Sequence, residues 1–385
     1  MRIVIFNLKW SYGTEQNTAN LTRELGKYAE VNVISGQKPV SGGETKAARS
    51  DKYTDAIRDF VNPLTYIRIL AKIRQYRPQV VYFLGPHVLN APLTLLCRWF
   101  SDACVIVHVH DAEYAPSSPV ARFADAVARL QSRFAHRVYC YGARIKREIV
   151  RNFGVPKDRI ATFRLGPSHW TQADLGATVP KPSPRQFSMI GTLIYRKGVE
   201  YFLEAARLFN EAHGKNAAQF VLAGSGDISR YKAAIERLPN LVVMNRFVED
   251  AEVNELLTKS YASVLPYIEG VMQSSFVAIA YGNGCPVIVS DLGSLPEEVE
   301  NGKTGFVVEK ANAAQIAEAM TAIYSERENS RFSENCLRAY KEKFSWEQIG
   351  AQLFRDMERS AELFGKHSRT AEGTGGGGLA GRLLR

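Results

Sequence analysis

Residues 265–298, LPYIEGVMQSSFVAIAYGNGCPVIVSDLGSLPEE, carry the pattern that decides the fold class: a buried strand, a polar loop, a helix and a second buried strand. The first strand is expected to end at Val264–Leu265 and the second to span Pro286–Ser290. Buried strands that alternate with helices are typical of an open α/β sheet. The stretch therefore predicts an α/β protein.

The polar loop of this stretch ends in Gln273-Ser274-Ser275, where the first free N–H groups of the helix are expected. Small hydroxyl and amide side chains cap such groups, and the positive helix end also suits an anion such as a diphosphate. Glu269 stands at the carboxyl end of the preceding strand, where open α/β sheets bind ligands. The local sequence thus fits both an ordinary helix cap and an anion-binding loop.

Length and composition favour a two-domain globular protein. The chain has 385 residues, 45% hydrophobic and 23% charged, which is enough for two cores. No apolar run reaches the about 18–20 residues of a membrane span, and Met1–Phe6 is better read as a first buried strand than as a signal peptide. The five cysteines form no C-x-x-C pair, so we expect reduced thiols in a cytoplasmic protein and no zinc site.

The excess of positive over negative charge is confined to the first half of the chain. Through Thr178 there are 25 Lys and Arg against 14 Asp and Glu, whereas the remainder has 24 against 25. This asymmetry indicates an anionic partner, such as a membrane surface, a lipid phosphate or nucleic acid. Solubility alone is an equally good explanation.

Two helices of this half bear on that question. The expected helix Pro63–Tyr76 has apolar residues at helical spacing: Leu64, Ile67, Leu70, Ala71 and Ile73. The expected helix Ser118–His136 is amphipathic and basic, a type that lies on anionic membranes but also occurs as an ordinary solvated helix.

A series of short motifs resembles the donor site of family-4 retaining glycosyltransferases of the GT-B fold, in the subgroup with a Gln-Ser pair in the donor loop. The matching residues are Pro266-Tyr267, Glu269-Gly270, Gln273-Ser274, Ala280-Tyr281, Gly284-x-Pro286-Val287-Ile288 and Gly293-x-x-Pro296-Glu297. The resemblance is more specific in the C-terminal half and extends over nearly all of the chain except its last residues.

The resemblance implies two doubly wound, Rossmann-like domains that face each other across a cleft. We expect an acceptor-binding domain at residues 1–178, a proline-rich linker near 178–185 and a nucleotide-sugar donor domain at 179–345. A C-terminal helix, 346–365, is expected to cross back to the first domain. Residues 366–385 are of low complexity and are expected to be disordered.

The resemblance also assigns roles to residues of the second domain. Arg196 and Lys197 are expected to stabilise the leaving diphosphate, with Thr192 at the position where the family usually has an arginine. The remaining donor contacts are expected from Gly224, from Phe247 and Val248 at the base, from Gln273, Ser274 and Ser275 at the diphosphate, and from Glu269 at the sugar. Two cations at the diphosphate remove the need for a metal, and no D-x-D pair is present, so we expect no metal and no cofactor.

Two residues of the first half complete the expected site. His110, beside Asp111 at the end of the expected strand Cys104–Val109, corresponds to a family histidine that meets the donor sugar or its phosphate. Gly13 lies in the first loop, where the family commonly has a glycine pair that meets phosphate or acceptor. The family's second glutamate, which holds the ribose, aligns with Ile279, so the ribose must be held in another way.

The implied activity is the transfer of a sugar from a UDP- or GDP-linked donor to a hydroxyl acceptor, with retention at the anomeric carbon. A lipid-diphosphate-linked glycan is the expected acceptor, in surface polysaccharide (exopolysaccharide, capsule or lipopolysaccharide) biosynthesis at the inner face of the plasma membrane. A GT-B sugar-nucleotide 2-epimerase and a catalytically inactive nucleotide-sugar-binding protein remain alternatives. A nucleic-acid-binding function has no motif to support it.

Overall fold

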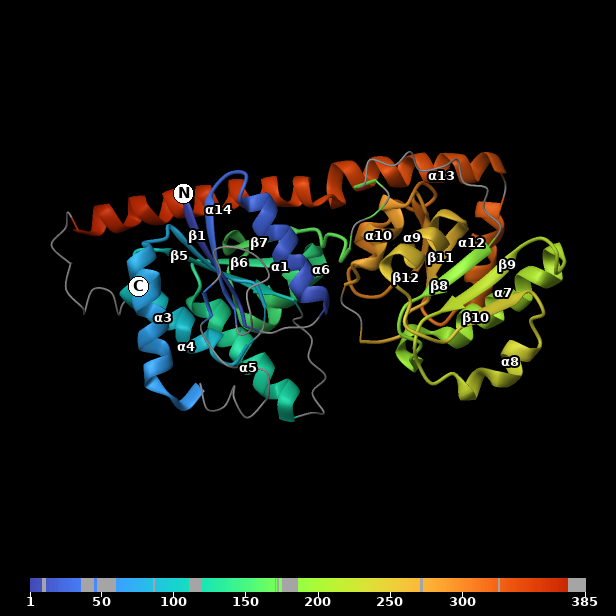
Figure 1. Ribbon diagram of the computed structural model, residues 1–385, viewed down its shortest axis with the longest axis horizontal. Helices are drawn as coiled ribbons and strands as arrows, with labels where there is room; N and C mark the ends of the chain where they lie inside the picture. The colour runs from blue at the N-terminus through green and yellow to red at the C-terminus, as the bar shows by residue number, and fades with distance from the viewer. Residues whose placement is uncertain are drawn as a thin grey trace. The chain divides into compact units, whose positions relative to one another are not determined.

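The computed structural model describes residues 1–8, 12–35, 45–46, 60–85, 87–110, 119–169, 171, 173–174, 186–270, 273–324 and 326–372. The chain divides into two compact α/β units, each shown in Figure 1. The first unit comprises Met1–Arg164 with Ile349–Arg385, and the second comprises Leu165–Gln348. In the described part of the chain, no helix has both the length and the apolar character to cross a membrane.

The first unit is built on a parallel sheet with the strand order β3-β2-β1-β4-β5-β6-β7. Its central strands are buried along almost their whole length, as the long apolar runs of the sequence require. The strands are β1 (Arg2–Asn7), β2 (Glu30–Ser35), β3 (Thr45–Lys46), β4 (Val80–Phe83), β5 (Cys104–Val109), β6 (Arg137–Tyr141) and β7 (Ile160–Phe163). The helices are α1 (Tyr12–Leu25), α3 (Pro63–Tyr76), α4 (Asn90–Phe100), α5 (Pro119–Phe134) and α6 (Gly142–Glu148).

The second unit has a parallel sheet with the order β10-β9-β8-β11-β12-β13. Its strands are β8 (Gln186–Ile190), β9 (Gln219–Ala223), β10 (Leu241–Met244), β11 (Ser260–Leu265), β12 (Val287–Ser290) and β13 (Gly305–Val308). Its helices are α7 (Val199–His213), α8 (Lys232–Glu236), α9 (Asp250–Thr258), α10 (Phe276–Gly282), α11 (Leu295–Glu298), α12 (Ala313–Tyr324) and α13 (Glu326–Ala339). One core joins the sheet to α7 and α12, and a second core joins its other face to α9 and α10.

Residues 265–298 fold as predicted, from the end of β11 through α10 to β12 and α11. The prediction of an α/β protein with two doubly wound, Rossmann-like units is therefore confirmed. All five cysteines are buried, and none of them forms a disulfide.

The first unit ends at Arg164, earlier than the expected division at residue 178. The segment that follows packs on the second unit: the Tyr340 hydroxyl donates to the Asp174 carboxylate at 2.6 Å, and Trp346 Nε1 donates to the Pro167 carbonyl at 2.9 Å. The proline-rich residues 178–185 lie outside the described residues.

The C-terminal helix α14 (Trp346–Glu372) returns to the first unit, as predicted. Asp356 forms a two-point ion pair with Arg137 of β6, with N–O distances of 3.0 and 2.7 Å, and Phe354 stacks on Tyr28 at 5.1 Å between ring centroids. The helix continues past the predicted end at residue 365, as far as Glu372. Residues 366–372 contain no glycine or proline, the two residues that oppose a helix most strongly, whereas Gly373 follows them directly.

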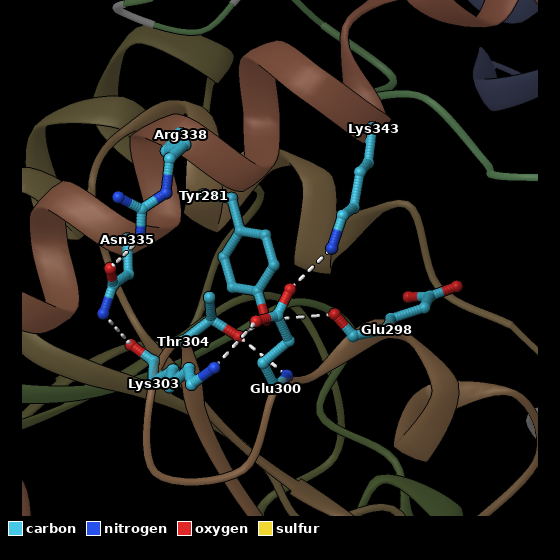
Figure 2. Close-up of polar contacts among 8 residues, drawn as sticks. All are labelled: Tyr281, Glu298, Glu300, Lys303, Thr304, Asn335, Arg338 and Lys343. Carbon is cyan, nitrogen blue, oxygen red and sulfur yellow. Dashed lines mark hydrogen bonds and ion pairs between the residues drawn. The ribbon is translucent and has the colours of Figure 1, made fainter.

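A polar cluster around Tyr281 joins three segments of the second unit (Figure 2). The buried Tyr281 hydroxyl donates to the Glu298 carbonyl at 3.2 Å, and its oxygen lies 2.7 Å from Thr304 Oγ1. The Glu300 carboxylate forms ion pairs with Lys343 and Lys303, and Lys343 lowers its pKa. The cluster thereby ties α10 to the segment between β12 and β13 and to Lys343, four residues after the end of α13.

Candidate functional site

The second unit gathers most of the predicted site residues at one edge of its sheet. Parallel strands all end at the same edge, so the loops after β8, β9, β10 and β11 are neighbours there. The residues brought to this edge are Thr192, Arg196 and Lys197 after β8, Gly224 after β9, Phe247 and Val248 after β10, and Glu269, Gln273, Ser274 and Ser275 after β11.

The loops after β8 and β11 are locked together by their backbones. Gly198 has φ +74°, and a Cβ at this position would lie 1.9 Å from the Pro266 carbonyl oxygen, so only glycine fits. The Ile268 N–H donates to the Arg196 carbonyl at 3.0 Å, and Arg196 Nη1 donates to the Gly270 carbonyl at 3.3 Å. These contacts place the Arg196 guanidinium beside the loop that carries Glu269.

Lys197 is held by an aromatic ring that sequence reasoning did not identify. Its Nζ atom lies 3.6 Å from the ring centroid of Tyr267, and this ring is itself buried. A cation over a ring face is stabilised by the negative potential of the ring. The motif residues were visible in the sequence, but their contact joins positions 70 residues apart and becomes evident only in the fold.

Gly224 has a structural role at the same edge. Its φ is +141°, and a Cβ there would lie 1.8 Å from the Gly191 carbonyl oxygen. The Leu193 N–H donates to the Ser225 carbonyl at 2.9 Å in the same contact. The glycine is therefore required for the packing of the loop after β8 on the loop after β9, whether or not a nucleotide approaches it.

The helix-cap prediction holds for one serine. Ser274 Oγ accepts from the Phe276 N–H at 3.3 Å, whereas Ser275, the residue before α10, makes no side-chain cap bond. Gln273 Oε1 is buried and has no hydrogen-bond partner, which is unusual for a buried polar atom. Ile279 is 3% exposed and belongs to the core, so its position on α10 is not directed at a ligand.

Phe247 stands out at the end of β10 because its ring is 60% exposed, whereas the neighbouring Val248 is buried. Arg246 donates to the Phe247 carbonyl at 3.0 Å and forms an ion pair with Glu252 at 2.6 Å. The hydrogen bond from Arg246 lowers the pKa of Glu252 to about 2. These contacts hold a flat apolar ring at the sheet edge, where a planar base could stack on it.

His110 belongs to the first unit and follows β5 directly, as predicted. Its Nε2 lies 2.6 Å from the Leu84 carbonyl oxygen, and its ring packs edge-on to Tyr141 at 5.4 Å between centroids. The neighbouring His108 is buried, with its Nδ1 2.6 Å from the Tyr82 hydroxyl, and burial lowers its pKa well below the usual value.

Gly13 is not a loop residue: α1 begins at Tyr12, so Gly13 lies in the first turn of the helix. The first turn accepts glycine readily because its N–H groups need no partner within the helix. Asp111 lies outside the described residues. Within the described ranges, no group of three or more His, Cys, Asp or Glu side chains is arranged to hold a metal ion.

Both halves of the chain match family models. Residues 13–166 match the model described as "Glycosyl transferase 4-like domain", and residues 184–326 match "Glycosyl transferases group 1". The glycogen synthase of Mycobacterium tuberculosis is 26% identical over 268 residues, which cover 67% of this chain and 63% of that protein. The chain thus spans less than two thirds of the length of this relative.

Two solved structures share the fold at low sequence identity. HepE of Anabaena, solved in complex with UDP, has a TM-score of 0.69 at 14% identity, covering 93% of this chain and 100% of that chain. WaaG, a glycosyltransferase involved in lipopolysaccharide biosynthesis, has a TM-score of 0.64 at 12% identity, covering 92% of this chain and 99% of that chain.

Proposed function

Since the chain belongs to the glycosyltransferases, by a 4-like domain in its first half and a group 1 domain in its second, and has the GT-B fold, we propose that it transfers a sugar from a nucleotide diphosphate sugar to a hydroxyl acceptor. The donor is expected to be linked to UDP or GDP. We further propose retention at the anomeric carbon, as in the family-4 enzymes with a Gln-Ser pair in the donor loop.

The locked loops after β8 and β11 are the observation that supports this proposal most directly. The backbone bond from Ile268 to Arg196 and the close contact of Gly198 with Pro266 bring two cations to the loop of Glu269. When the donor reacts, negative charge develops on the diphosphate oxygens, and fixed cations stabilise that charge without reorganising. Arg196 and Lys197 are proposed to do so without a metal.

The reaction proposed is a front-side displacement. The bond between the anomeric carbon and the diphosphate oxygen breaks, the acceptor oxygen bonds to the same face, and a phosphate oxygen accepts the acceptor's proton. Glu269 and His110 are proposed to orient the sugar. No residue of the chain is required as a covalent nucleophile.

The base and the ribose have separate proposed contacts. The exposed ring of Phe247 provides a surface for the base, with Val248 behind it. Because Ile279 is part of the core, a ribose hydroxyl must find its acceptor elsewhere. The buried Gln273 Oε1, which lacks a partner, is the acceptor we propose.

A thermal-shift screen with UDP, GDP, ADP and their common sugars, without added metal, tests donor binding. A ligand at about 100 times its dissociation constant adds about 2.7 kcal/mol to the free energy of unfolding, which raises the melting temperature measurably. Lys197→Ala is expected to abolish the shift. Lys215→Ala, which removes an exposed lysine in the turn between α7 and β9, is the matched control and is expected to keep it. No shift with any nucleotide, or an unchanged shift in Lys197→Ala, would contradict the proposed donor site.

Turnover and stereochemistry are tested with the nucleotide sugar that gives the selective shift. Slow hydrolysis of this donor, followed by NMR of the released sugar, distinguishes an enzyme from an inactive binding protein. Release of the sugar with inverted configuration would overturn the proposal of retention.

We propose a lipid-linked glycan of surface polysaccharide biosynthesis as the acceptor, which is supported by the basic first half of the chain.

A further inference from the structure

A cavity of about 690 Å³ within the first unit is lined by residues of the sheet and of helix α14. Cys104 and Arg137 are the first residues of β5 and β6, and Arg159 stands directly before β7. The cavity therefore lies at the amino edge of the sheet. Pockets that bind small organic molecules have volumes of about 300–1,000 Å³, so this cavity is large enough for one.

The cavity is distant from the candidate site residue of the same unit. His110 follows the last residue of β5, at the carboxyl edge of the sheet, whereas Cys104 begins this strand. A strand of six residues is about 20 Å long. A molecule in the cavity would therefore not touch His110, and the function proposed above gives the cavity no role.

The charged side chains of the cavity are mainly positive. The cations that line it are Arg98, Arg137, Arg159 and Arg359. Two carboxylates, Asp158 and Asp356, also line it, and Asp356 is paired with Arg137 at 2.7 Å. His136 is neutral at pH 7, because burial lowers its pKa to about 3. The lining thus has two positive charges more than negative charges.

Two of these cations are fixed at the end of α5. Arg98 Nη1 donates to the Phe134 carbonyl at 3.1 Å, and Arg159 Nη2 donates to the Ser132 carbonyl at 3.2 Å. These carbonyl groups position the guanidinium groups, but a helix end carries only about half of an elementary charge and cannot neutralise both. Burial lowers the pKa of Arg98, and repulsion from Arg159 lowers it further. A bound anion would relieve this repulsion.

Arg159 has further donors for such an anion. Its hydrogen bonds to the described part of the chain all come from Nη2, so Nε and Nη1 remain for a ligand. His136 adds one more donor, because its Nδ1 accepts from the Val105 N–H at 2.9 Å and its proton therefore lies on Nε2.

We propose that this cavity binds a small phosphomonoester. Guanidinium groups bind phosphate oxygens through paired N–H···O bonds, a geometry that a lysine cannot offer. A phosphate monoester carries a charge of about −1.5 to −2 at pH 7, which matches the excess charge of the lining. Arg98 and Arg159 are assigned to the phosphate. The inference does not rest on the transfer reaction, because it concerns binding at another edge of the sheet.

The wall supplied by α14 favours an organic phosphate over the free ion. Phe364 packs against the His136 ring, with 4.2 Å between ring centroids, and Leu363 is 49% exposed. Both side chains line the cavity together with the arginines. The carbon skeleton of the ligand would pack on this apolar wall, and burial of its surface would add to the affinity.

Isothermal titration calorimetry of the full chain at pH 7.5 and constant ionic strength tests the proposal. The probes are phenyl phosphate, inorganic phosphate and phenol. Phenyl phosphate is expected to bind at least about threefold more tightly than inorganic phosphate, since it alone uses both the cations and the apolar wall. Phenol, which lacks the anion, is expected not to bind measurably.

Variants of the lining test the assignment. Arg159→Gln is expected to weaken phenyl phosphate binding at least about tenfold, because it removes charge-assisted hydrogen bonds. Asp158→Asn removes a negative charge from an exposed position of the lining and is expected to strengthen binding about threefold. Phe364→Ala is expected to weaken binding of phenyl phosphate but not of inorganic phosphate.

Arg359→Gln and Arg355→Gln form a matched pair on α14. Both arginines are exposed and stand one turn apart, but only Arg359 lines the cavity. Arg359→Gln is expected to weaken binding about threefold, and Arg355→Gln is expected to bind within about twofold of wild type. Thermal melting of every variant separates loss of binding from loss of folding, which matters most for Arg159 because it caps α5.

Two further measurements locate the binding. Phenyl phosphate is expected to slow hydrogen exchange in α14, because this helix supplies one wall of the cavity. Lys197→Ala is expected to retain phenyl phosphate binding, so a failure of the proposed donor site would leave this inference intact. Loss of binding in Lys197→Ala would instead assign the phosphate to the donor site and overturn the inference.

Three other results would overturn the proposal. The wild-type chain could bind neither phosphate probe, or Arg159→Gln and Arg359→Gln could bind phenyl phosphate as the wild type does. Inorganic phosphate could bind as tightly as phenyl phosphate, which would show that the apolar wall contacts no ligand and that the cavity is not a site for a phosphomonoester.

Discussion

The contact between Gly198 and Pro266 determines how the loops of the candidate site meet, and it leads to a quantitative prediction. The two loops approach until a Cβ at Gly198 would lie 1.9 Å from the Pro266 carbonyl oxygen. Ordinary contacts of a Cβ begin at 3.4 Å, so an alanine would force the loops about 1.5 Å apart. The oxygen belongs to the backbone and cannot rotate away as a side chain would.

Gly198→Ala therefore has two costs. A side chain at φ +74° destabilises the fold by about 1 kcal/mol, and the collision adds about 1–3 kcal/mol, as for overpacked cores. The free energy of unfolding should fall by about 2–4 kcal/mol. Gly302→Ala separates the two effects, because Gly302 has the same φ of +74° but no atom within 4 Å of its added Cβ. It should lose only about 1 kcal/mol.

Urea unfolding of both variants measures the difference, and the nucleotide thermal shift measures its effect on the site. Gly198→Ala should also weaken nucleotide binding, since it separates Arg196 and Lys197 from the loop of Glu269. Equal losses of stability in the two variants would refute the argument that the close loop contact requires glycine. An unchanged nucleotide shift in Gly198→Ala would show that the contact does not shape the donor site.

Three further predictions concern stability. Burial, and to a smaller extent repulsion from two arginines, lowers the pKa of His136 to about 3. Below about pH 6.5 the unfolded chain therefore binds a proton at this residue that the folded chain does not bind, so the free energy of unfolding falls as the pH decreases. Between pH 7 and pH 5 this residue should account for about 2 kcal/mol, and His136→Gln should reduce the loss by that amount in urea titrations at each pH. Tyr281→Phe removes the hydroxyl that bonds Thr304 Oγ1 and the Glu298 carbonyl in a buried cluster, and it should cost about 1–3 kcal/mol by urea unfolding. A neutral result would mean that these two bonds add no stability. Asp356→Ala leaves the half-buried Arg137 guanidinium without its carboxylate, so the free energy of unfolding should fall by about 1–3 kcal/mol. Hydrogen exchange in α14 should become faster. Unchanged exchange would show that the ion pair does not hold this helix.

The sequence was sufficient to predict the fold class and the order of the elements around the site. Buried parallel strands are near-continuous apolar runs, so β5 and β12 could be located almost to the residue. Positions at the carboxyl ends of strands follow from the same pattern, because all parallel strands end at one edge. Arg196, Glu269 and His110 follow β8, β11 and β5, so the strand pattern alone predicts that each lies beyond the carboxyl edge of its sheet.

Contacts between distant segments depended on the tertiary structure. The sequence shows Gly198 and Tyr267 as members of short motifs, but the collision with Pro266 and the ring beneath Lys197 arise when β8 and β11 pair side by side. The exposed ring of Phe247 and the buried amide of Gln273 likewise depend on neighbours that are remote in sequence.

Helix α3 shows most clearly where periodicity stops being informative. Apolar residues occur around most of this helix, so spacing alone selects a face that includes Leu64 and Ile67. In the structure the buried residues of α3 are Thr65, Ile69 and Ile73, so of the predicted apolar set only Ile73 is buried; Leu70 is half-buried, and Leu64, Ile67 and Ala71 are exposed. A sequence determines which residues are apolar, but the packing of the whole chain decides which of them find a protein neighbour and which stay exposed.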